Sequence, residues 1–418
     1  MNIFDDLQWR GLIQDSTDAS SLADQLDGEP VTFYIGVDAT GKSMHVGHFT
    51  QILTARRLQN AGHFPILLVG GATGLIGDPK ESGERPLQSR DAVARNAEGI
   101  REQMGPFMDF DCKNPARLVN NLDWTSEMSM IDFLRDVGKH FPINKMLARE
   151  VVSARLESGV SFTEFSYQLI QANDFRQLRE EYGCTLQFGG SDQWGNITAG
   201  VDYIRRSTGA TAHAFVTPLV TKADGTKFGK SEGEAVWLDP ELTSPYAFYQ
   251  FWVNTDDRDI GKYLRFFSFR SHDEILELEK ATSERPAARQ AQKALAEELT
   301  TLLHGKAECE QVIAASQALF GRGTLSQLQE STLEAALSEA GTTVVDDAAN
   351  TSIATLFKNS GLVKSLSEAR RAVKEGGAYV NNVRVTDPDA VLADEEWLHG
   401  RLAVLRRGRK TFAGLKRS

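Results

Sequence analysis

The stretch VTFYIGVDATGKSMHVGHFTQILTARRLQNAGHFPILLVGG, residues 31–71, decides the fold. It contains an apolar run at 31–37, a segment with helical periodicity from Met44 to Asn60, and a second apolar run at 65–71. Short apolar runs on either side of a helix are typical of buried parallel strands joined by a crossover. The stretch therefore predicts a β-α-β unit.

The same alternation continues toward the carboxyl end. The further segments are a helix near 89–104, the strand-like RLVNNLDW (117–124), several helices at 125–182, the strand CTLQFGG (184–190), a helix from about Ser191 and the strand AHAFVTPLV (212–220). Strands that alternate with helices predict one parallel sheet covered by helices. We therefore expect an α/β, Rossmann-like doubly wound domain over residues 1–223, with ligands bound beyond the carboxyl ends of its strands.

The rest of the chain divides by composition. Residues 244–323 show apolar positions three and four apart, which indicates helices, whereas 324–350 is rich in Ser, Thr, Ala, Glu and Asp. We expect a connecting loop at 224–243, a helical domain at 244–323, a loosely structured linker at 324–350 and a compact domain at 351–418.

Charge is distributed unevenly along the 418 residues. The formal net charge of −11 argues against a protein that coats nucleic acid non-specifically. Residues 401–418, however, contain seven basic and no acidic side chains, so the remaining 39 basic and 57 acidic residues give −18. The basic end is suited to meet a polyanion.

Cysteine content and hydropathy indicate a cytoplasmic protein. The three cysteines, Cys112, Cys184 and Cys309, are far apart and form no CxxC pair, so neither a disulfide framework nor a structural zinc site is expected. No apolar run approaches the roughly 20 residues that span a bilayer, and the first residues lack a basic region followed by an apolar one. We expect no membrane association and no export.

A misleading motif lies inside the fold-determining stretch. Residues 36–43, GVDATGKS, match the GxxxxGK[ST] pattern of a phosphate-cradling loop between a strand and a helix. Asp38, however, would place a carboxylate in a loop whose amides should face phosphate, and no apolar strand ending in Asp follows to hold magnesium. We therefore disfavour a P-loop nucleotidase.

Two short motifs together indicate phosphate chemistry. His45-Val-Gly-His48 begins the first helix, and Lys227-Phe-Gly-Lys230-Ser231 lies in a Gly- and Asp-bearing loop after a later strand. A carboxylate that attacks the α-phosphorus of ATP needs donors that stabilise the charge growing on the phosphates. His45 and His48 share one side of the first turns, and Gly47 lets a nucleotide approach the backbone.

HVGH and KFGKS resemble the two signatures of class I aminoacyl-tRNA synthetases, and KFGKS is the form seen in tyrosyl enzymes. Four further blocks look like those of the bacterial tyrosyl family: YIGVDAT (34–40), GLIGDP (74–79), SFTEFSYQ (161–168) and GGSDQWGN (189–196). The resemblance covers nearly the whole chain.

The resemblance implies roles for individual residues. Tyr34 and Asp174 would bond the phenol hydroxyl of tyrosine, Asp78, Tyr167 and Gln171 would hold its ammonium group, and Gln193 would lie near the reacting carboxylate. The residues implied for ATP are Gly36, Asp38, Thr40, His45, Gly47, His48, Gly190, Asp192 and Lys230. The residues implied for catalysis are Thr40, His45, His48, Lys227, Lys230 and Ser231.

The chain also departs from some relatives. Ile35 and Gln51 stand where others carry smaller polar residues near the ribose, and the segment 80–86 differs from a more basic loop. Arg85 remains a candidate for the phosphates, whereas the role of Lys80 stays open.

The carboxyl-terminal region, at 353–385, resembles the S4 RNA-binding domain, a small α+β fold. Arg370, Arg371 and Lys374 would lie on one side of a short helix before a double-glycine turn, and could grip RNA backbone. We add Arg406, Arg407 and Arg409 of the basic end to this candidate RNA surface.

The implied function is tyrosine–tRNA ligation. Tyrosine would attack ATP to give tyrosyl-adenylate and pyrophosphate, and the 3′ terminal adenosine of tRNA(Tyr) would then take the tyrosine. Mg²⁺ would accompany ATP without a dedicated protein site. The resemblance further implies a homodimer through the helical insertion around 131–141 and an anticodon-facing role for 244–323.

Three alternatives stay open at this point. The first is a tryptophanyl enzyme, which shares the chemistry. The second is another HxGH nucleotidyltransferase, in which KFGKS and the carboxyl-terminal region would have no role, and the third is an RNA-binding protein that lost catalysis, which would not need the motif residues.

Overall fold

The computed structural model describes the chain except residues 1, 80–82, 84–85, 227, 232–233 and 409–410. It forms two compact units, one of Met1–Asp239 with Thr255–Ala291, the other of Pro240–Asn254 with Gln292–Ser418. Within this described part, no helix has both the length and the apolar character needed to cross a membrane.

The first unit is built on a six-stranded sheet. Its strands are β1 (Asp15–Ser16), β2 (Thr32–Asp38), β3 (Phe64–Gly70), β4 (Arg117–Asn120), β5 (Cys184–Gly190) and β6 (His213–Thr217). The order across the sheet is β1-β6-β5-β2-β3-β4, and every pair is parallel except β1 with β6. The expected parallel sheet is confirmed, and β1 is an edge strand that the sequence did not reveal.

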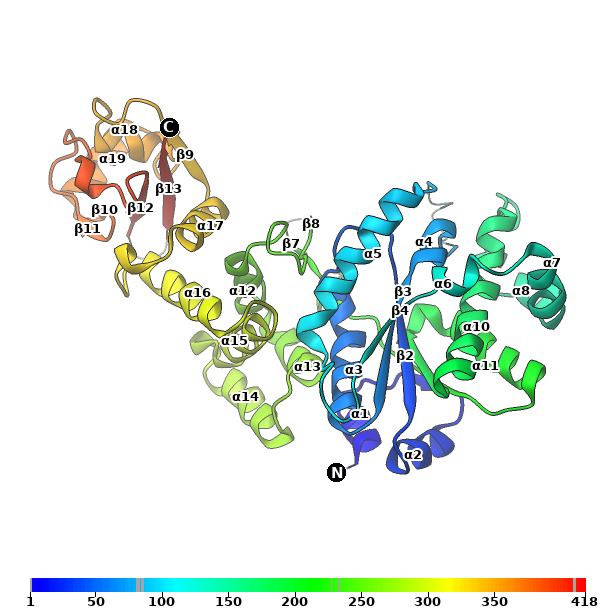
Figure 1. The fold of residues 1–418 in the computed structure, drawn as a ribbon. Helices are drawn as coiled ribbons and strands as arrows, with labels where there is room; N and C mark the ends of the chain where they lie inside the picture. The colour runs from blue at the N-terminus through cyan, green and yellow to red at the C-terminus, as the bar shows by residue number, and fades with distance from the viewer. Residues whose placement is uncertain (1, 80–82, 84–85, 227, 232–233, 409–410) are drawn as a thin grey trace. The chain divides into compact units, whose positions relative to one another are not determined.

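Helices cover both faces of this sheet. On one face lie η1 (Val46–His48), α3 (Phe49–Asn60) and α5 (Arg90–Met104), and on the other lie α10 (Phe162–Tyr182) and α11 (Trp194–Thr208) (Figure 1). The shorter helices α1 (Ile3–Arg10) and α2 (Ala19–Asp27) come before β2, whereas α4 (Gly71–Ile76) directly follows β3. Ser89 and Ser161 begin α5 and α10 by accepting a hydrogen bond from a first-turn amide, as N-cap residues do.

The helical insertion is a series of short pieces. They are α6 (Leu122–Thr125), α7 (Met130–Asp132), a π-helical turn (Phe133–Val137), η4 (Gly138–His140), α8 (Ile143–Leu147) and α9 (Glu150–Ser153), whereas η2 (Gly105–Phe107) lies before β4. A buried ion pair between Arg155 and Glu164, 2.8 Å apart, joins the end of this series to the first turn of α10.

The chain returns to the first unit after it has entered the second. Helices α13 (Asp257–Phe267) and α14 (His272–Glu284) belong to the first unit, so the predicted helical domain 244–323 contributes to both units. The buried guanidinium groups of Arg10 and Arg57 both donate to the carbonyl oxygen of Ser268, just beyond α13. These donors satisfy carbonyl groups that a helix end leaves unpaired.

The second unit combines helices with a small sheet. Its helices are α12 (Pro245–Val253), α15 (Gln290–His304), α16 (Lys306–Leu319), α17 (Glu330–Ala340), α18 (Ile353–Asn359) and α19 (Leu366–Lys374). Its strands are β9 (Thr342–Val345), β10 (Ala378–Val380), β11 (Val383–Arg384), β12 (Leu402–Arg407) and β13 (Thr411–Arg417). They are ordered β11-β10-β12-β13-β9, and a compact apolar core lies between this sheet and α18 and α19.

The segment 324–350 is not the loosely structured linker that its composition predicted. It contains α17 and β9, and β9 pairs in parallel with β13 as the edge of the small sheet. Arg401 and Lys416 of the basic end pair with Glu330 and Glu334 of α17. The acidic residues that suggested a solvated linker are therefore partners of the basic strand ends, and Leu333 and Leu337 supply a buried helix face.

Close packing between α17 and β13 requires glycine at position 414. A Cβ atom there would lie 2.7 Å from Leu337 Cβ and 2.8 Å from Thr342 Oγ1. We expect Gly414→Ala to lower the free energy of unfolding by about 1–3 kcal/mol through overpacking. Scanning calorimetry of the full chain measures the change, and Gly105→Ala, where a Cβ meets open space, is the matched control. Equal stability of the two variants would show that α17 does not pack on β13.

Candidate functional site

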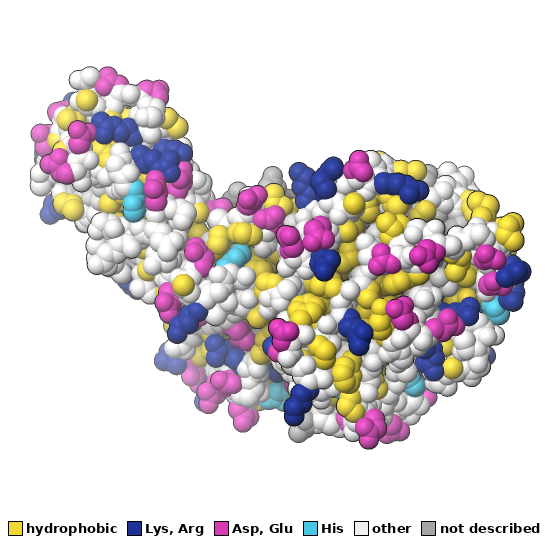
Figure 2. Space-filling view, in the orientation of Figure 1, with side chains coloured by type: hydrophobic (Ala, Val, Ile, Leu, Met, Phe, Trp, Pro, Cys, Tyr) yellow, Lys and Arg dark blue, Asp and Glu magenta, His cyan; other side chains and the backbone are white. Residues whose placement is uncertain are grey.

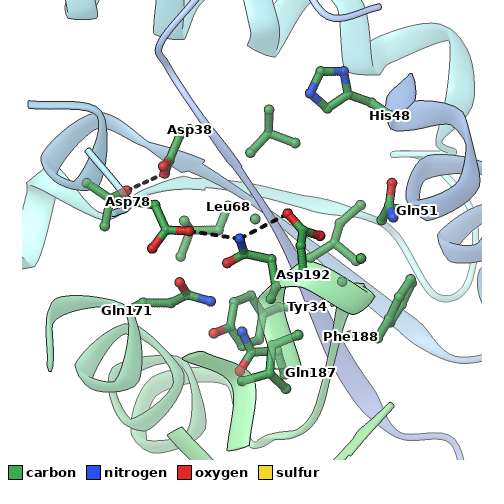
Figure 3. A pocket seen from close by; sticks show the side chains of 18 of the residues that line it. Tyr34, Asp38, His48, Gln51, Leu68, Asp78, Gln171, Gln187, Phe188 and Asp192 are labelled. Carbon is green, nitrogen blue, oxygen red and sulfur yellow. Dashed lines mark hydrogen bonds between the residues drawn. The ribbon is translucent and has the colours of Figure 1, made fainter. Parts of the chain in front are cut away.

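A cavity of about 320 Å³ opens at the carboxyl ends of β2 and β5. Strand order reverses between these two strands, since β2 continues to β3 on one side and meets β5 on the other. Open α/β sheets bind ligands at such a switch point. Figure 3 shows Tyr34 and Gln171 at one end of the cavity and His48 and Gln51 at the other.

A buried carboxylate marks the inner end of the cavity. Asp174 of α10 is 1% exposed and accepts hydrogen bonds from Asn121 Nδ2 at 2.9 Å and from Trp124 Nε1 at 2.8 Å. The hydroxyl of Tyr34 is buried beside it without a hydrogen-bond partner among the described residues. A buried polar atom without a partner is costly, so its presence indicates a polar ligand.

Burial dominates the protonation of this end. It raises the pKa of the Asp174 carboxyl to about 8, although the hydrogen bonds from Asn121 and Trp124 lower it. Burial and the nearby Asp174 also raise the pKa of Tyr34 well above its usual value, so Tyr34 keeps its proton. The inner end therefore offers a hydroxyl donor and a carboxyl acceptor.

A second carboxylate lies on the cavity wall in a ring of amides. Asp78 accepts from Gln193 Nε2 at 2.9 Å and from Asn196 Nδ2 at 3.1 Å, and Asn196 also donates to Gln193 Oε1 at 3.0 Å. Burial raises the pKa of Asp78. The buried Gln171 Oε1 has no hydrogen-bond partner in the part of the chain that the structure describes. A carboxylate and a neutral acceptor in one wall suit a cationic group.

Tyr167 is held by a carboxylate that the sequence associated with phosphate. Its hydroxyl donates to Asp38 Oδ2 at 2.8 Å, while Thr73 Oγ1 donates to Asp38 Oδ1 at 2.7 Å. Asp38 therefore orients Tyr167 within the cavity wall.

The two histidines of HVGH are held by backbone groups of the motif itself. The N–H of Gly47 donates to Nδ1 of His45 at 3.0 Å, which leaves the ring proton of neutral His45 on Nε2. Nδ1 of His48 lies 3.1 Å from both the N–H and the carbonyl oxygen of His45, so it can accept from one or donate to the other. Burial lowers the pKa of both histidines, to about 4 for His48, so both are neutral at pH 7. His45 therefore remains a hydrogen-bond donor through Nε2. Gly47 is required here because a Cβ would lie 2.6 Å from the His45 ring.

Backbone pairing brings the KFGKS segment to HVGH. Val46 N donates to Val236 O at 3.0 Å, and Leu238 N donates to Met44 O at 2.9 Å. HVGH is thus paired with residues 236–238, just after KFGKS, and Val236 N donates to Gly229 O of KFGKS at 2.9 Å.

The described part of the KFGKS segment also contacts α13. The ring of Phe228 packs on Tyr263 and Phe267, with centroids 5.0 and 5.4 Å away. Lys227 lies outside the described residues. Of Lys230 and Ser231 only the backbone, in β7 (Lys230–Ser231), is described; it pairs with β8 (Glu234–Ala235).

The cavity gathers most of the predicted substrate residues. Those that line it are Tyr34, Gly36, Asp38, Thr40, His45, Gly47, His48, Asp78, Tyr167, Gln171, Asp174, Gly190, Asp192 and Gln193. Ile35 and Gln51, noted as departures, line it as well, and Gln51 Nε2 donates to Thr217 Oγ1 at 2.9 Å. Lys80 and Arg85 lie outside the described residues.

Four residues of the site were missed from the sequence. Asn121, Trp124, Asn196 and Thr73 each donate a hydrogen bond to a carboxylate of the site. Thr73 also lines the cavity, and Asn196 is the last residue of GGSDQWGN. A signal existed for two of them, because NNLDW places polar groups directly after a buried strand of the sheet.

The basic residues predicted for RNA are placed differently from one another. Arg370, Arg371 and Lys374 are exposed on α19, where Arg370 pairs with Asp389. Arg407 donates to Leu362 O and pairs with Glu368. Arg406 is instead buried, 7% exposed, and donates to Asn382 Oδ1 and Gly408 O, so its guanidinium serves the fold of the second unit. Arg409 lies outside the described residues.

Comparison with protein families gives two matches. The family described as "tRNA synthetases class I (W and Y)" matches residues 26–321, and "Tyrosine--tRNA ligase SYY-like C-terminal domain" matches residues 332–415. Together they span most of both units.

Individual relatives agree with these matches. The chain is 60% identical to a tyrosine–tRNA ligase of Streptomyces coelicolor and 53% identical to one of Corynebacterium glutamicum, each covering at least 99% of both chains. A C-terminally truncated mitochondrial tyrosyl-tRNA synthetase of Aspergillus nidulans is similar in structure, with TM-score 0.69, 32% identity and coverage of 74% of this chain and 92% of that one. A Plasmodium falciparum tryptophanyl-tRNA synthetase, at 13% identity and TM-score 0.54, shares the fold alone.

The raised pKa of Asp174 has a direct spectroscopic consequence. We expect the protonated carboxyl of the ligand-free protein to give an infrared carbonyl band that disappears as pH rises through about 8. Asn121→Leu removes a donor that stabilises the ionised form, so the band should persist to higher pH. Asp174→Asn identifies the band by removing it. A carboxyl that is already ionised at pH 6 would contradict the expectation.

Proposed function

The chain belongs to the tyrosine–tRNA ligases, and from this premise we propose which residues carry out each step of the reaction. The enzyme activates L-tyrosine with ATP to tyrosyl-adenylate and pyrophosphate, and it then transfers tyrosine to tRNA. Both the adenylate and its precursors must fit the cavity at the ends of β2 and β5.

One observation carries the assignment of the tyrosine site: buried polar atoms of Tyr34 and Gln171 face the cavity without partners in the described part of the chain. The phenol hydroxyl of tyrosine donates to Asp174 and accepts from Tyr34. A substrate without this hydroxyl would leave both groups buried and unpaired, which costs free energy. Phenylalanine is therefore disfavoured.

The ammonium group of tyrosine takes the opposite wall. Asp78 supplies a carboxylate, Gln171 a carbonyl oxygen and Tyr167 a hydroxyl oxygen, and the ring of amides around Asp78 fixes its direction. Gln193, oriented by the same ring, lies where the substrate carboxylate attacks ATP.

ATP occupies the HVGH end. Thr40, the Nε2–H of His45 and the imidazole of His48 stabilise charge on the phosphates as pyrophosphate leaves, and a neutral imidazole suffices because it can still donate a hydrogen bond. Gly36, Asp38, Gly47, Gly190 and Asp192 shape the nucleotide subsite.

The KFGKS lysines complete the phosphate site. Lys227 and Lys230, with Ser231 in the same motif, close over pyrophosphate, and contacts made only as charge develops would raise the rate without tightening ATP binding. Phe228 and the ladder to HVGH place the segment beside the cavity.

Magnesium enters with ATP on its phosphate oxygens. No cluster of three or more potential metal ligands occurs among the described residues, and the oxygens of Asp38 and Asp78 already accept protein hydrogen bonds. The ion would add to the neutralisation of charge on the phosphates.

The tRNA substrate suggests a role for the second unit and a location for the enzyme. Exposed Arg370, Arg371 and Lys374 form a basic helix face suited to RNA backbone, while helices of 244–323 would approach the anticodon. Since charged tRNA is used where proteins are made, we place the enzyme in the cytoplasm.

An exposed apolar surface in the insertion supports a homodimer. Met130, Ile131 and Phe162 are 77%, 69% and 73% exposed, and Leu134 and Ile143 add to the same region. Figure 2 shows hydrophobic side chains on the surface at the right, where α7 and α8 lie in Figure 1. Exposed apolar side chains that gather in one part of a surface mark an interface, and we propose a second copy as the occupant because a two-fold axis brings the same surface of both subunits together.

The tyrosine assignment is tested by amino-acid-dependent ATP–pyrophosphate exchange. We expect exchange with tyrosine and little with phenylalanine or tryptophan. Asp174→Asn should lower kcat/KM for tyrosine about tenfold or more, and Tyr34→Phe severalfold, because each loses a hydrogen bond to the phenol. Neither variant should lower kcat/KM for phenylalanine, so discrimination falls.

Lys230→Ala is the companion variant for the phosphate end. It should reduce exchange while equilibrium dialysis shows unchanged tyrosine affinity. If Asp174→Asn lowered kcat/KM for tyrosine and for phenylalanine by the same factor, this residue would not recognise the hydroxyl.

The dimer is tested by charged residues in the apolar surface. Ile131→Asp combined with Phe162→Asp should give a monomer in sedimentation velocity, because two buried unpaired carboxylates in each subunit would oppose association. Leu276→Asp, on α14 at 45% exposure, is the matched control and should remain dimeric. A double variant that sediments like the parent chain would exclude this surface as the interface.

A further inference from the structure

The segment 39–44, between β2 and HVGH, overlaps the phosphate-cradling pattern of residues 36–43, yet protein groups already engage part of its backbone. Ala39 N donates to Gly70 O, Thr40 N to Asp38 O at 2.8 Å, and Met44 N to Gln103 Oε1 at 2.8 Å. Amide side chains of α5 and of the residues just before it hold this segment.

A pair of amide side chains holds the first half of the loop. Gln88, just before α5, donates from Nε2 to the carbonyl oxygen of Thr40 at 2.8 Å. Asn96 of α5 donates to Ala39 O and to Gln88 Oε1, each at 3.1 Å. Because Asn96 occupies the oxygen of the Gln88 amide, the nitrogen of that amide is directed at Thr40.

A third amide holds the second half. Gln103 Oε1 accepts from Met44 N and from the hydroxyl of Ser43, the latter at 3.1 Å. Ser43 also accepts from Asp239 N at 3.3 Å, at the end of the segment that follows KFGKS. Gln103 therefore fixes the residue directly before His45.

The helix approaches the loop closely between these two points. A Cβ on Gly99 would lie 3.0 Å from the carbonyl oxygen of Lys42, so a larger residue would displace the loop. Asn96, Gly99 and Gln103 follow the i, i+3, i+7 spacing of one helix face. Glycine in a helix interior is unfavourable, which indicates that this close approach has a use.

We propose that Gln88, Asn96 and Gln103 are positioning residues for tyrosine activation, which hold the backbone of 39–44 so that Thr40 and His45 meet the phosphates of ATP as their charge develops. The inference rests on the assignment of Thr40 and His45 to the phosphates under Proposed function. None of the three amides touches substrate. They act through Thr40 O, Ala39 O and Met44 N.

The position of these amides predicts which step of the reaction a substitution slows. Misplacement of catalytic donors by a fraction of an ångström slows the chemical step, whereas the tyrosine site at Tyr34 and Asp174 is held by other elements. Loss of an amide should therefore reduce the rate of adenylate formation at saturating substrates and leave tyrosine affinity unchanged.

The test is rapid-quench measurement of tyrosyl-adenylate formation by the full-length enzyme, with tyrosine affinity from equilibrium dialysis. Gln103→Met removes the acceptor with little change of volume, whereas Gln103→Glu keeps it. Asn96→Asp removes both donors at constant size. Gly99→Ala favours the helix but moves the loop. Glu102→Ala, on the exposed side of α5, is the control.

We expect Gln103→Met and Asn96→Asp to slow adenylate formation about tenfold or more at saturating ATP and tyrosine. Gly99→Ala should slow it severalfold, while Gln103→Glu and Glu102→Ala stay within about threefold of the parent. Tyrosine affinity and the melting temperature of Gly99→Ala should not fall.

Two results would overturn the inference: parental rates in Gln103→Met and Asn96→Asp, or equal slowing in Gln103→Glu and Gln103→Met. Thr40→Ala separates this failure from that of the proposed function. If Thr40→Ala forms adenylate at the parental rate, the phosphate assignment itself is wrong; if it is slow while the amide variants are not, only the positioning role is lost.

Discussion

Two backbone hydrogen bonds, Val46 N to Val236 O and Leu238 N to Met44 O, are the constraint on which the active site depends. They join the start of the first crossover helix to a segment almost two hundred residues later. A contact of this sequence separation carries a large loop-closure entropy, so it persists only where both segments are fixed independently. The sheet and α5 fix one side, and Phe228 on α13 fixes the other. The phosphate site therefore needs the whole first unit.

The cavity is lined by buried polar atoms, and only some of them have hydrogen-bond partners within the chain. In most proteins such atoms find partners within the chain, because leaving them unpaired is costly. Here the hydroxyl of Tyr34 and the oxygen of Gln171 remain without partners among the described residues. The neighbouring amides of Asn121 and Asn196 are used to hold carboxylates instead. Folding energy from the surrounding core thus maintains a site that is complementary to a polar molecule.

Sequence patterns predicted the elements that obey periodicity and the residues that belong to motifs. The runs at 31–37 and 65–71 became β2 and β3 because buried parallel strands must be apolar, and HVGH reached the cavity because it follows β2. Side chains that act through other side chains had a weaker signal or none. Asn196 stood out only as the last residue of GGSDQWGN, and nothing local distinguishes Gln103 from a surface amide. The linker prediction at 324–350 failed because acidic residues were taken as solvated, whereas Glu330 and Glu334 pair with Arg401 and Lys416. Arg406 was placed on the surface for the same reason, although its guanidinium completes a buried turn.

Two of the carboxylates that line the cavity would explain a preference for a zwitterion with a neutral polar tip. Burial raises the pKa of both Asp78 and Asp174, so each is unfavourable as a charge unless a ligand supplies a partner. An ammonium group beside Asp78 restores the ionised form through opposite charge, and the cost of burying that carboxylate is then offset by the ligand. Asp174 meets no cation in the proposed complex, only donors, so it is stabilised by a third hydrogen bond rather than by charge. A ligand without a hydroxyl would leave Asp174 with the two donors Asn121 and Trp124 alone. In the proposed complex, the site therefore recognises the amino end of the substrate by charge and the phenol end by hydrogen bonds.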